Sequence, residues 1–214
     1  MEKPVAIITG ASQGLGREIA RLLAKRDYSL VLNARRAEPL AAVARELGAE
    51  AVTGDVSEIA EQIADRALTR FGRVDLLVNN ASEIGPSPMP RLEDYPWEEL
   101  LRVFRVNVVA PLHLAQLVLP SMKSRRSGTI INITSDAGSN AYAGWGGYGA
   151  SKAALDHASR IFAKELEGTG VRVLVVDPGD MNTEMHRLAE PGVDLSHLPL
   201  PADVAPRILE ELAA

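Results

Sequence analysis

The chain of 214 residues contains no cysteine, which excludes disulfides, thiolate catalysis and cysteine-ligated zinc, and which fits a reducing compartment. Aromatic residues are scarce, with three Phe, two Trp and four Tyr, and the net charge at pH 7 is −5. A surface for nucleic acid, which would be basic and would stack on bases, is therefore not expected. The four histidines lack the spacing of metal ligands, so we expect no metal site: His113, His157, His186 and His197.

Long apolar runs are also lacking, and we expect no segment of the length of a membrane span. The first residues, Met1 to Pro4, lead directly into an apolar strand and leave no room for a signal peptide. We therefore expect a cytoplasmic protein. With 46% hydrophobic and 24% charged residues, the composition is that of a globular protein, and the length fits one domain over residues 1–214.

The start of the chain predicts a strand, a glycine turn and a helix. The apolar run of residues 5–9 leads into Gly10, Gly14 and Gly16, which have the spacing GxxxGxG, and a helical pattern follows. Glycine permits positive φ and close approach of a ligand, and the free amides at a helix start favour an anion. The pattern therefore predicts a site for a nucleotide pyrophosphate, and the alternative is a tight turn without a ligand.

A second predicted strand, residues 28–33, is followed by Ala34, Arg35 and Arg36. In this kind of unit the end of the second strand faces the adenosine ribose. A carboxylate there would bind the ribose hydroxyls, whereas guanidinium pairs with a phosphate. We therefore predict that Arg35 binds a 2′-phosphate, which means NADP(H) in preference to NAD(H). Arg36 fits a phosphate contact and the solvated start of the next helix equally well.

Three further polar residues have more than one interpretation each. Asp55, near the end of a predicted strand over residues 49–56, either bonds the adenine amino group or, with Ser57, caps the next helix. Asn79, with the residue that follows it, either bridges strands or ties down a nucleotide loop, and for Asn79 we favour stabilisation of the turn. Asn107, in an apolar helical segment, makes a structural bond to a strand or belongs to a water-mediated proton path.

Strands alternate with helices along the whole chain. This pattern predicts an α/β fold, a parallel sheet with helices on both faces in three αβα layers, wound right-handed. Ser135 ends a predicted strand over residues 128–135. Tyr148 and Lys152, four residues apart at the head of a helix, lie on one helix face and can act on one bound molecule.

These motifs resemble the classical short-chain dehydrogenase/reductase family, and the resemblance runs from residue 4 to the C-terminus. They are Thr9-Gly10-xxx-Gly14-x-Gly16, Asn79-Asn80-Ala81, Ser135, Tyr148-xxx-Lys152 and Pro178-Gly179-xxx-Thr183. The resemblance implies that Ser135, Tyr148 and Lys152 are catalytic and that Asn107 completes a tetrad. Tyr148 would exchange a proton with the substrate oxygen, Ser135 would hold that oxygen, and the Lys152 ammonium would lower the pKa of the phenol and bind the nicotinamide ribose.

The resemblance also implies a set of dinucleotide contacts. They are Gly10, Ser12, Gln13, Gly14, Leu15, Gly16, Arg35, Asp55, Val56, Asn80, Ala81, Tyr148, Lys152, Pro178, Gly179, Met181 and Thr183. Two residues depart from the family. Ser82 replaces the usual glycine, so its side chain crowds or bonds the cofactor, and Gln13 stands at a position that is often basic in NADP-preferring members.

The chain stops soon after a helix that begins near Ala202, so we expect the family's last edge strand to be absent. We then expect a homodimer through the helices around residues 100–124 and 148–168. The lid over residues 185–199 is short, which predicts an open substrate site. Trp145 is expected to line that site beside Tyr148, and Trp97 to be a packing residue.

With the resemblance, we expect a Rossmann-type doubly wound parallel sheet with the strand order 3-2-1-4-5-6. The protein is then predicted to be an NADP(H)-dependent oxidoreductase that acts on a carbonyl or secondary alcohol. One alternative is an NAD(H)-dependent alcohol dehydrogenase of the same family. Another is a dinucleotide-binding regulator without turnover. The complete set of Ser135, Tyr148 and Lys152 argues against a regulator, which needs no proton donor beside the nicotinamide.

Overall fold

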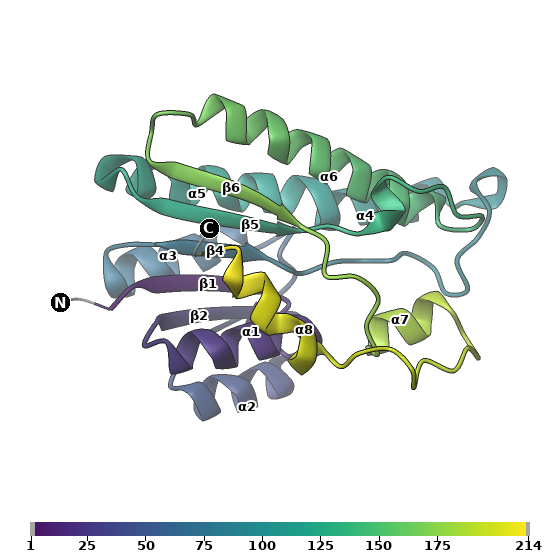
Figure 1. Ribbon diagram of the computed structural model, residues 1–214, viewed down its shortest axis with the longest axis horizontal. Coiled ribbons are helices and arrows are strands. Elements are labelled where there is room, and N and C mark those ends of the chain that lie inside the picture. Colours follow the sequence, from purple (N-terminus) through teal and green to yellow (C-terminus); the bar gives the residue numbers. More distant parts are fainter. Residues whose placement is uncertain (1–2, 213–214) are drawn as a thin grey trace.

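Within residues 3–212, which the computed structural model describes, six parallel strands form one sheet in the order β3-β2-β1-β4-β5-β6 (Figure 1). This confirms the predicted doubly wound fold and its strand order. Met1, Glu2, Ala213 and Ala214, the ends of the expected domain, lie outside the described residues. The strands are β1 (Val5–Thr9), β2 (Ser29–Ala34), β3 (Glu50–Thr53), β4 (Leu76–Asn79), β5 (Gly128–Ile133) and β6 (Val171–Val176).

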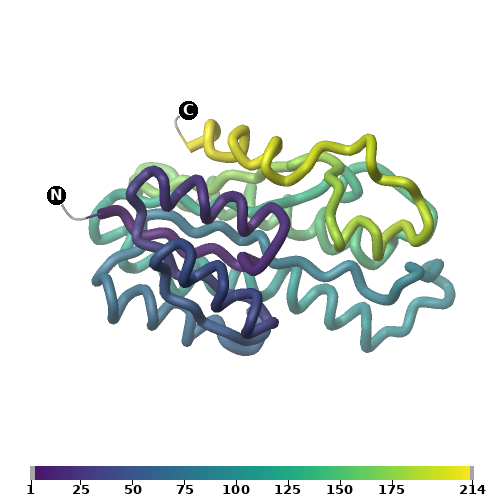
Figure 2. The backbone as a smooth tube through the Cα atoms, turned by 90° about the horizontal axis from the view of Figure 1, so that it is seen from below, coloured from purple at the N-terminus to yellow at the C-terminus, as the bar shows by residue number. Residues whose placement is uncertain are grey.

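Helices cover both faces of the sheet, and Figure 2 shows the resulting layers from a second direction. One face carries α1 (Gly14–Lys25), α2 (Ala37–Leu47) and α8 (Pro201–Glu210). The other carries α3 (Ala60–Phe71), α5 (Ala110–Arg125) and α6 (Gly146–Glu165). The remaining helical elements are η1 (Leu92–Asp94), α4 (Trp97–Phe104), the π-helical η2 (Arg105–Val109), η3 (Asp136–Gly138) and α7 (Glu184–Ala189).

The core explains why the strands are continuous apolar runs. Successive residues of β1 point to opposite faces: Val5 and Ile7 pack with α3 and α5, whereas Ala6 and Ile8 pack with α1 and α8. Because both faces of the sheet are covered, both sets must be apolar. In α8, Leu209 is completely buried against this core.

Two strands end earlier than predicted. The strand expected over residues 128–135 ends at Ile133, and the one expected over residues 49–56 ends at Thr53. Ser135 and Asp55 therefore lie in loops beyond the carboxyl edge of the sheet. Ligands of open α/β sheets bind at that edge, so both residues lie where a ligand is expected.

The stretch Trp97–Arg125 is one continuous helical segment of 29 residues with a mean hydropathy of 1.4, long and apolar enough by length and composition to cross a membrane. The expectation that no segment reaches that length is therefore wrong for this stretch. Leu114, Val118 and Met122 are fully buried in the core, so α5, which forms the second part of this segment, is a core helix. Trp97 itself is 63% exposed, which contradicts its expected role in packing.

The packing of α8 on α1 gives a test of the fold. Leu209→Ala should lower the free energy of unfolding by about 2–5 kcal/mol, because it leaves a cavity in a fully buried position. Leu200→Ala, at an exposed position just before α8, is the matched control and should change stability by no more than about 0.5 kcal/mol. Urea denaturation followed by circular dichroism measures both, and equal effects would show that α8 is not part of the cooperative core.

Candidate active site

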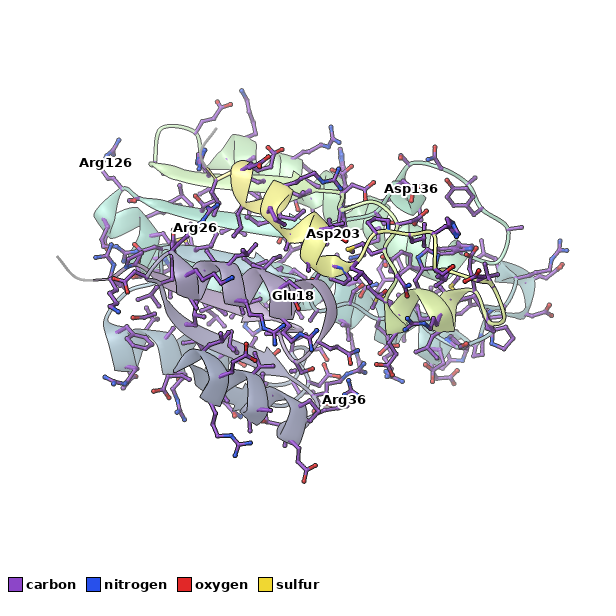
Figure 3. The ribbon with its side chains drawn as sticks, turned by 60° about the horizontal axis from the view of Figure 1, so that its bottom comes forward. Glu18, Arg26, Arg36, Arg126, Asp136 and Asp203 are labelled. Carbon is purple, nitrogen blue, oxygen red and sulfur yellow. The ribbon has the colours of Figure 1, made fainter. Side chains whose placement is uncertain are left out.

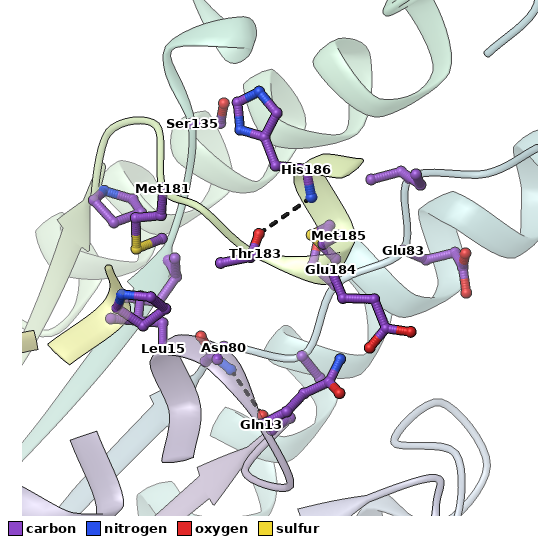
Figure 4. A pocket seen from close by; sticks show the side chains of 18 of the residues that line it. Gln13, Leu15, Asn80, Glu83, Ser135, Met181, Thr183, Glu184, Met185 and His186 are labelled. Carbon is purple, nitrogen blue, oxygen red and sulfur yellow. Dashed lines mark hydrogen bonds between the residues drawn. The ribbon is translucent and has the colours of Figure 1, made fainter. Parts of the chain in front are cut away.

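A cavity of about 850 Å³ opens at the carboxyl ends of the strands, between the glycine loop and α7 (Figure 4). This size suits a cofactor with part of a substrate. Of the residues predicted to contact a dinucleotide or to act in catalysis, Gly16 and Asn107 are outside the lining. The others line the cavity: Gly10, Ser12, Gln13, Gly14, Leu15, Arg35, Asp55, Val56, Asn80, Ala81, Ser135, Tyr148, Lys152, Pro178, Gly179, Met181 and Thr183.

The glycine loop has the form of a cradle. At Gly16, an added Cβ would lie 2.5 Å from the carbonyl oxygen of Gly10, so this glycine is required for close packing of loop and helix. Gly14 has a φ of +56°, and no described atom would lie within 4 Å of a Cβ added there. The helix α1 begins at Gly14, and the side chain of Gln13 makes no capping bond to its first amides. Open space in front of unused helix amides fits a diphosphate.

Two asparagines hold this edge of the sheet together. The side-chain amide of Asn80 donates to Thr9 O at 3.0 Å, and Thr9 Oγ1 accepts from the backbone amides of Asn80 and Ala81. Asn80 therefore ties down the glycine loop. Asn79 is buried and donates to Asn132 Oδ1 on β5 at 2.8 Å, so it bridges two strands and the preferred interpretation as a turn residue is wrong.

The arginines after β2 both line the cavity, and both have carboxylate partners. Arg35 Nη1 donates to Glu83 Oε2 at 2.8 Å. Arg36 bonds the side-chain oxygen of Gln13 and lies 3.6 Å from a carboxylate oxygen of Glu184. Arg36, at the start of α2 (Figure 3), is thus both the beginning of a helix and a cavity residue.

Asp55 lines the same end of the cavity. Its Oδ1 accepts from the amide and the hydroxyl of Ser57 at 2.9 and 2.7 Å. The helix α3 begins only after Ile59, so the interpretation of Asp55 or Ser57 as its cap is wrong. The contact to adenine stays a prediction.

Tyr148 and Lys152 lie on the first turns of α6 and are buried, with 9% and 3% of their surfaces exposed. Lys152 Nζ donates to Ile133 O at 2.8 Å and lies 5.5 Å from the centre of the Tyr148 ring. Trp145 meets that ring edge-on with the ring centres 5.9 Å apart, which confirms its predicted place beside Tyr148. The two groups can therefore act on one molecule in the cavity.

Burial dominates the acid–base properties of this pair. It raises the pKa of Tyr148 to about 12, although the hydroxyls of Ser135 and Ser82 act in the opposite direction. Burial also lowers the pKa of Lys152 to about 8. The expectation that Lys152 brings the phenol pKa toward neutrality is therefore wrong for the chain alone, because desolvation of the phenolate is the largest effect on that pKa. At neutral pH the phenol keeps its proton.

Ser135 and Asp136 follow β5 after one residue, Thr134. Ser135 Oγ accepts from the amide of Ala137 at 3.2 Å and donates to Asp136 Oδ1 at 3.3 Å. The hydroxyl of Tyr142 donates to Asp136, and this bond holds the pKa of that carboxyl below its usual value. Ser135 is thus fixed by local bonds at the edge of the cavity.

Asn107 lies behind the cavity wall, in the π-helical turn η2. Its Oδ1 accepts from the amide of Glu83 at 2.7 Å and from the hydroxyl of Ser82 at 3.1 Å. Its Nδ2 donates to Glu83 O at 2.8 Å and to Ser151 Oγ at 2.9 Å. The side chain therefore makes structural bonds, but to the loop after β4 and to α6 rather than to a strand.

Among the cavity residues that sequence reasoning missed are Glu83, Glu184 and His186, which Figure 4 labels. His186 lies on α7, whose first turn is capped by Thr183, and its Nε2 is 3.1 Å from a carboxylate oxygen of Glu190. No pattern in the sequence identifies His186 as a cavity residue. Glu83 comes soon after the two asparagines, and its position could have identified it. Within residues 3–212 no cluster of three or more His, Asp or Glu side chains is arranged to hold a metal ion.

Comparison with known proteins gives consistent matches. The family model described as short chain dehydrogenase matches residues 4–193. The chain is 35% identical to 7alpha-hydroxysteroid dehydrogenase of Escherichia coli K12 over 94% of this chain and 83% of that protein. It is 33% identical to the 3-oxoacyl-[acyl-carrier-protein] reductase FabG of the same strain, over 87% and 77%. A short-chain dehydrogenase of Shigella flexneri 2a, solved in complex with NADP, superposes with a TM-score of 0.89 at 29% identity, over 98% and 90%.

The buried lysine predicts a pH dependence of stability. The pKa of Lys152 is about 8 in the folded chain and 10.5 ordinarily, so between these values the unfolded chain binds more protons. Stability should therefore rise with pH in this window, by up to about 1.4 kcal/mol per pH unit, and Lys152→Met should lose the rise. Denaturation with urea at several values between pH 8 and 9 measures this, below the ordinary tyrosine pKa of 10.0 at which Tyr148 titrates in the unfolded chain.

Lys164→Met, at an exposed lysine of the same helix, is the control and should keep the wild-type slope. Parallel pH profiles for wild type and Lys152→Met would contradict the burial of a lysine with a lowered pKa.

Proposed function

The chain belongs to the short-chain dehydrogenase family and is therefore an oxidoreductase, and within this class we propose that it is an NADP(H)-dependent enzyme that reduces a carbonyl, with Tyr148 as proton donor. One observation carries the proposal. A single cavity has the glycine cradle and Arg35 at one end, and the buried pair of Tyr148 and Lys152 at the other. The reverse reaction is the oxidation of a secondary alcohol.

The residues of the chain account for the proton step. The dinucleotide, when bound, supplies the hydride. The Tyr148 phenol, with a pKa of about 12, keeps its proton at neutral pH and donates it to the carbonyl oxygen. Ser135 Oγ donates a hydrogen bond to the same oxygen, in place of its 3.3 Å bond to Asp136 Oδ1. The nearby Lys152 ammonium stabilises the phenolate that remains, and its bond to Ile133 O fixes its position.

The same residues support dinucleotide binding. Amides at the start of α1 face open space over Gly14 and suit the diphosphate. Arg35 and Arg36 at the end of β2 suit a 2′-phosphate. We assign Asn107 to positioning, since its amide makes structural bonds. The further predicted contacts remain part of this proposal: Ser12, Leu15, Val56, Ala81, Pro178, Gly179, Met181 and Thr183.

One observation favours the NAD(H)-dependent alternative. Arg35 and Arg36 already have Glu83 and Glu184 as partners, so a 2′-phosphate must compete with carboxylates. We prefer NADP(H) because two permanent cations stand at the end of β2. The complex of the Shigella flexneri relative with NADP supports this choice.

We also propose a homodimer through the long helices. Large apolar side chains on them are exposed, and burial of such a surface in a partner would be favourable. They are Trp97 and Leu101 on α4, Val109 in η2 and Ile161 on α6.

We propose a cytoplasmic location as well, which the absence of cysteine supports.

Removal of the phenol tests catalysis. Tyr148→Phe should lower kcat by about 10²-fold or more in assays of NADPH with a panel of carbonyl compounds, because general acid catalysis contributes on this scale. The affinity for NADPH, from fluorescence titration, should stay within about threefold, since most dinucleotide contacts lie elsewhere in the cavity. Tyr28→Phe is the control, because Tyr28 does not line the cavity, and it should stay near wild type. A Tyr148→Phe enzyme with nearly full activity would refute the proton-donor role.

Removal of the guanidinium tests cofactor preference. The wild type should bind NADPH more tightly than NADH, and Arg35→Ala should reduce this ratio by about tenfold, because a charge-assisted contact to phosphate is lost. Arg91→Ala, at an exposed arginine that does not line the cavity, should leave the ratio unchanged. Equal binding of NADH and NADPH by the wild type would instead support the NAD(H) alternative.

A further inference from the structure

Glu83 places a fixed carboxylate in the wall of the cavity. Its side chain is only 12% exposed, and its Oε2 accepts from Arg35 Nη1 at 2.8 Å and from Arg102 Nη2 at 2.9 Å. Its backbone amide and carbonyl are both bonded to the side chain of Asn107. Because the backbone is held on both sides, the carboxylate cannot move away from the cavity by a shift of the loop.

The pair of Arg35 and Glu83 spans the crevice. Arg35 follows β2, Glu83 comes after β4, and β1 lies between these two strands. The ion pair therefore reaches across two strand spacings, roughly 9–10 Å, over the carboxyl end of β1 where the glycine loop begins. The strand order reverses between β1 and β4, and a dinucleotide in this crevice has its adenosine end on the β2 side of that point.

We propose that Glu83 sets the dinucleotide preference of the enzyme by competing with the 2′-phosphate for Arg35, and that Arg102 limits this competition. This inference rests on the proposed function, in which Arg35 binds that phosphate. The planar donors of guanidinium pair equally well with a carboxylate and a phosphate, so the 2′-phosphate can replace Glu83 as the partner. A ribose hydroxyl carries no charge and cannot, so Arg35 stays on Glu83 when NADH binds.

Arg102 makes the exchange of partners possible. It lies on α4, and its other carboxylate neighbour, Glu99, is further away at 3.6 Å. When Arg35 turns to a phosphate, Arg102 stays on Glu83 and keeps that carboxylate paired. Without Arg102, a largely buried and unpaired carboxylate would face an incoming dianion, which is unfavourable through both desolvation and repulsion. Arg102 is thus a positioning residue that acts through Glu83.

The second arginine of the crevice does not offer the same control. Arg36 and Glu184 are both more than half exposed and 3.6 Å apart, so water screens their attraction. Glu83 is far less exposed, and its two guanidinium partners are within hydrogen-bond distance. The pair of Arg35 and Glu83 is therefore the stronger of the two ion pairs.

The test compares the dinucleotide affinities of variants in which a charged side chain is replaced by neutral glutamine. Glu83→Gln should tighten NADPH about threefold to tenfold and change NADH less than twofold, because only the phosphate competes for Arg35. Arg102→Gln should weaken NADPH by a similar factor, and the double variant should resemble Glu83→Gln. Fluorescence titration of NADPH and NADH gives these values. Calorimetry with 2′,5′-ADP and AMP repeats them for the adenosine end alone.

The matched controls are Glu93→Gln and Arg91→Gln, which change the same charges in an exposed pair outside the cavity lining. Both should leave the ratio of affinities unchanged. Equal shifts for NADPH and NADH, or none, in Glu83→Gln would overturn the proposal. If Arg102→Gln does not fold, Arg102→Lys takes its place: a ratio near wild type supports the role of charge, and a ratio as low as that expected for glutamine contradicts it.

Arg35→Ala, titrated in parallel, separates the two levels of the argument. If it leaves a preference for NADPH intact, the assignment of Arg35 to the 2′-phosphate is wrong and the proposed function falls with it. If it removes the preference while Glu83→Gln and Arg102→Gln have no effect on the ratio, only the roles of Glu83 and Arg102 are refuted.

Discussion

The bond between Thr9 and Asn80 is the constraint on which the site depends. β1, which ends at Thr9, and β4, which ends just before Asn80, are neighbours, but the chain leaves β1 toward α1 on one face and leaves β4 toward α5 on the other. A crevice opens where the chain diverges in this way. Thr9 Oγ1 accepts two backbone amides from the β4 side, and Asn80 bonds back to Thr9 O. These buried polar groups satisfy each other and keep the two sides of the crevice in fixed relation.

Burial determines the acid–base properties of Tyr148 and Lys152. A phenol and an ammonium that were open to water would have ordinary pKa values. Packed under Trp145 and the end of β5, both shift toward their neutral forms. The free chain therefore holds a protonated phenol beside a lysine that titrates near physiological pH. This arrangement has a cost in stability, because an ionisable group without full solvation disfavours its charge.

The sequence predicted what depends on local pattern. The alternation of strands and helices, the glycine turn and the face shared by Tyr148 and Lys152 all follow from spacing over a few residues. The strand order, which is also confirmed, was predicted from the fold as a whole. What it could not predict depends on contacts between distant segments. Asn79 meets Asn132 across the sheet, and Arg35 meets Glu83 from a separate strand end. The direction of the Tyr148 pKa shift also escaped prediction, because it is set by the depth of burial.

The amide of Asn107 has a consequence for how such an enzyme can evolve. It bonds Ser82, both backbone groups of Glu83, and Ser151 on α6, so one buried side chain joins the cavity wall to the helix of Tyr148. Only the backbone of Glu83 takes part in these bonds, and its carboxylate is left out. Under the roles proposed for Glu83 and Tyr148, selection can therefore exchange the side chain at position 83 and alter the choice between phosphorylated and unphosphorylated coenzyme pools, while the proton-transfer geometry is inherited unchanged.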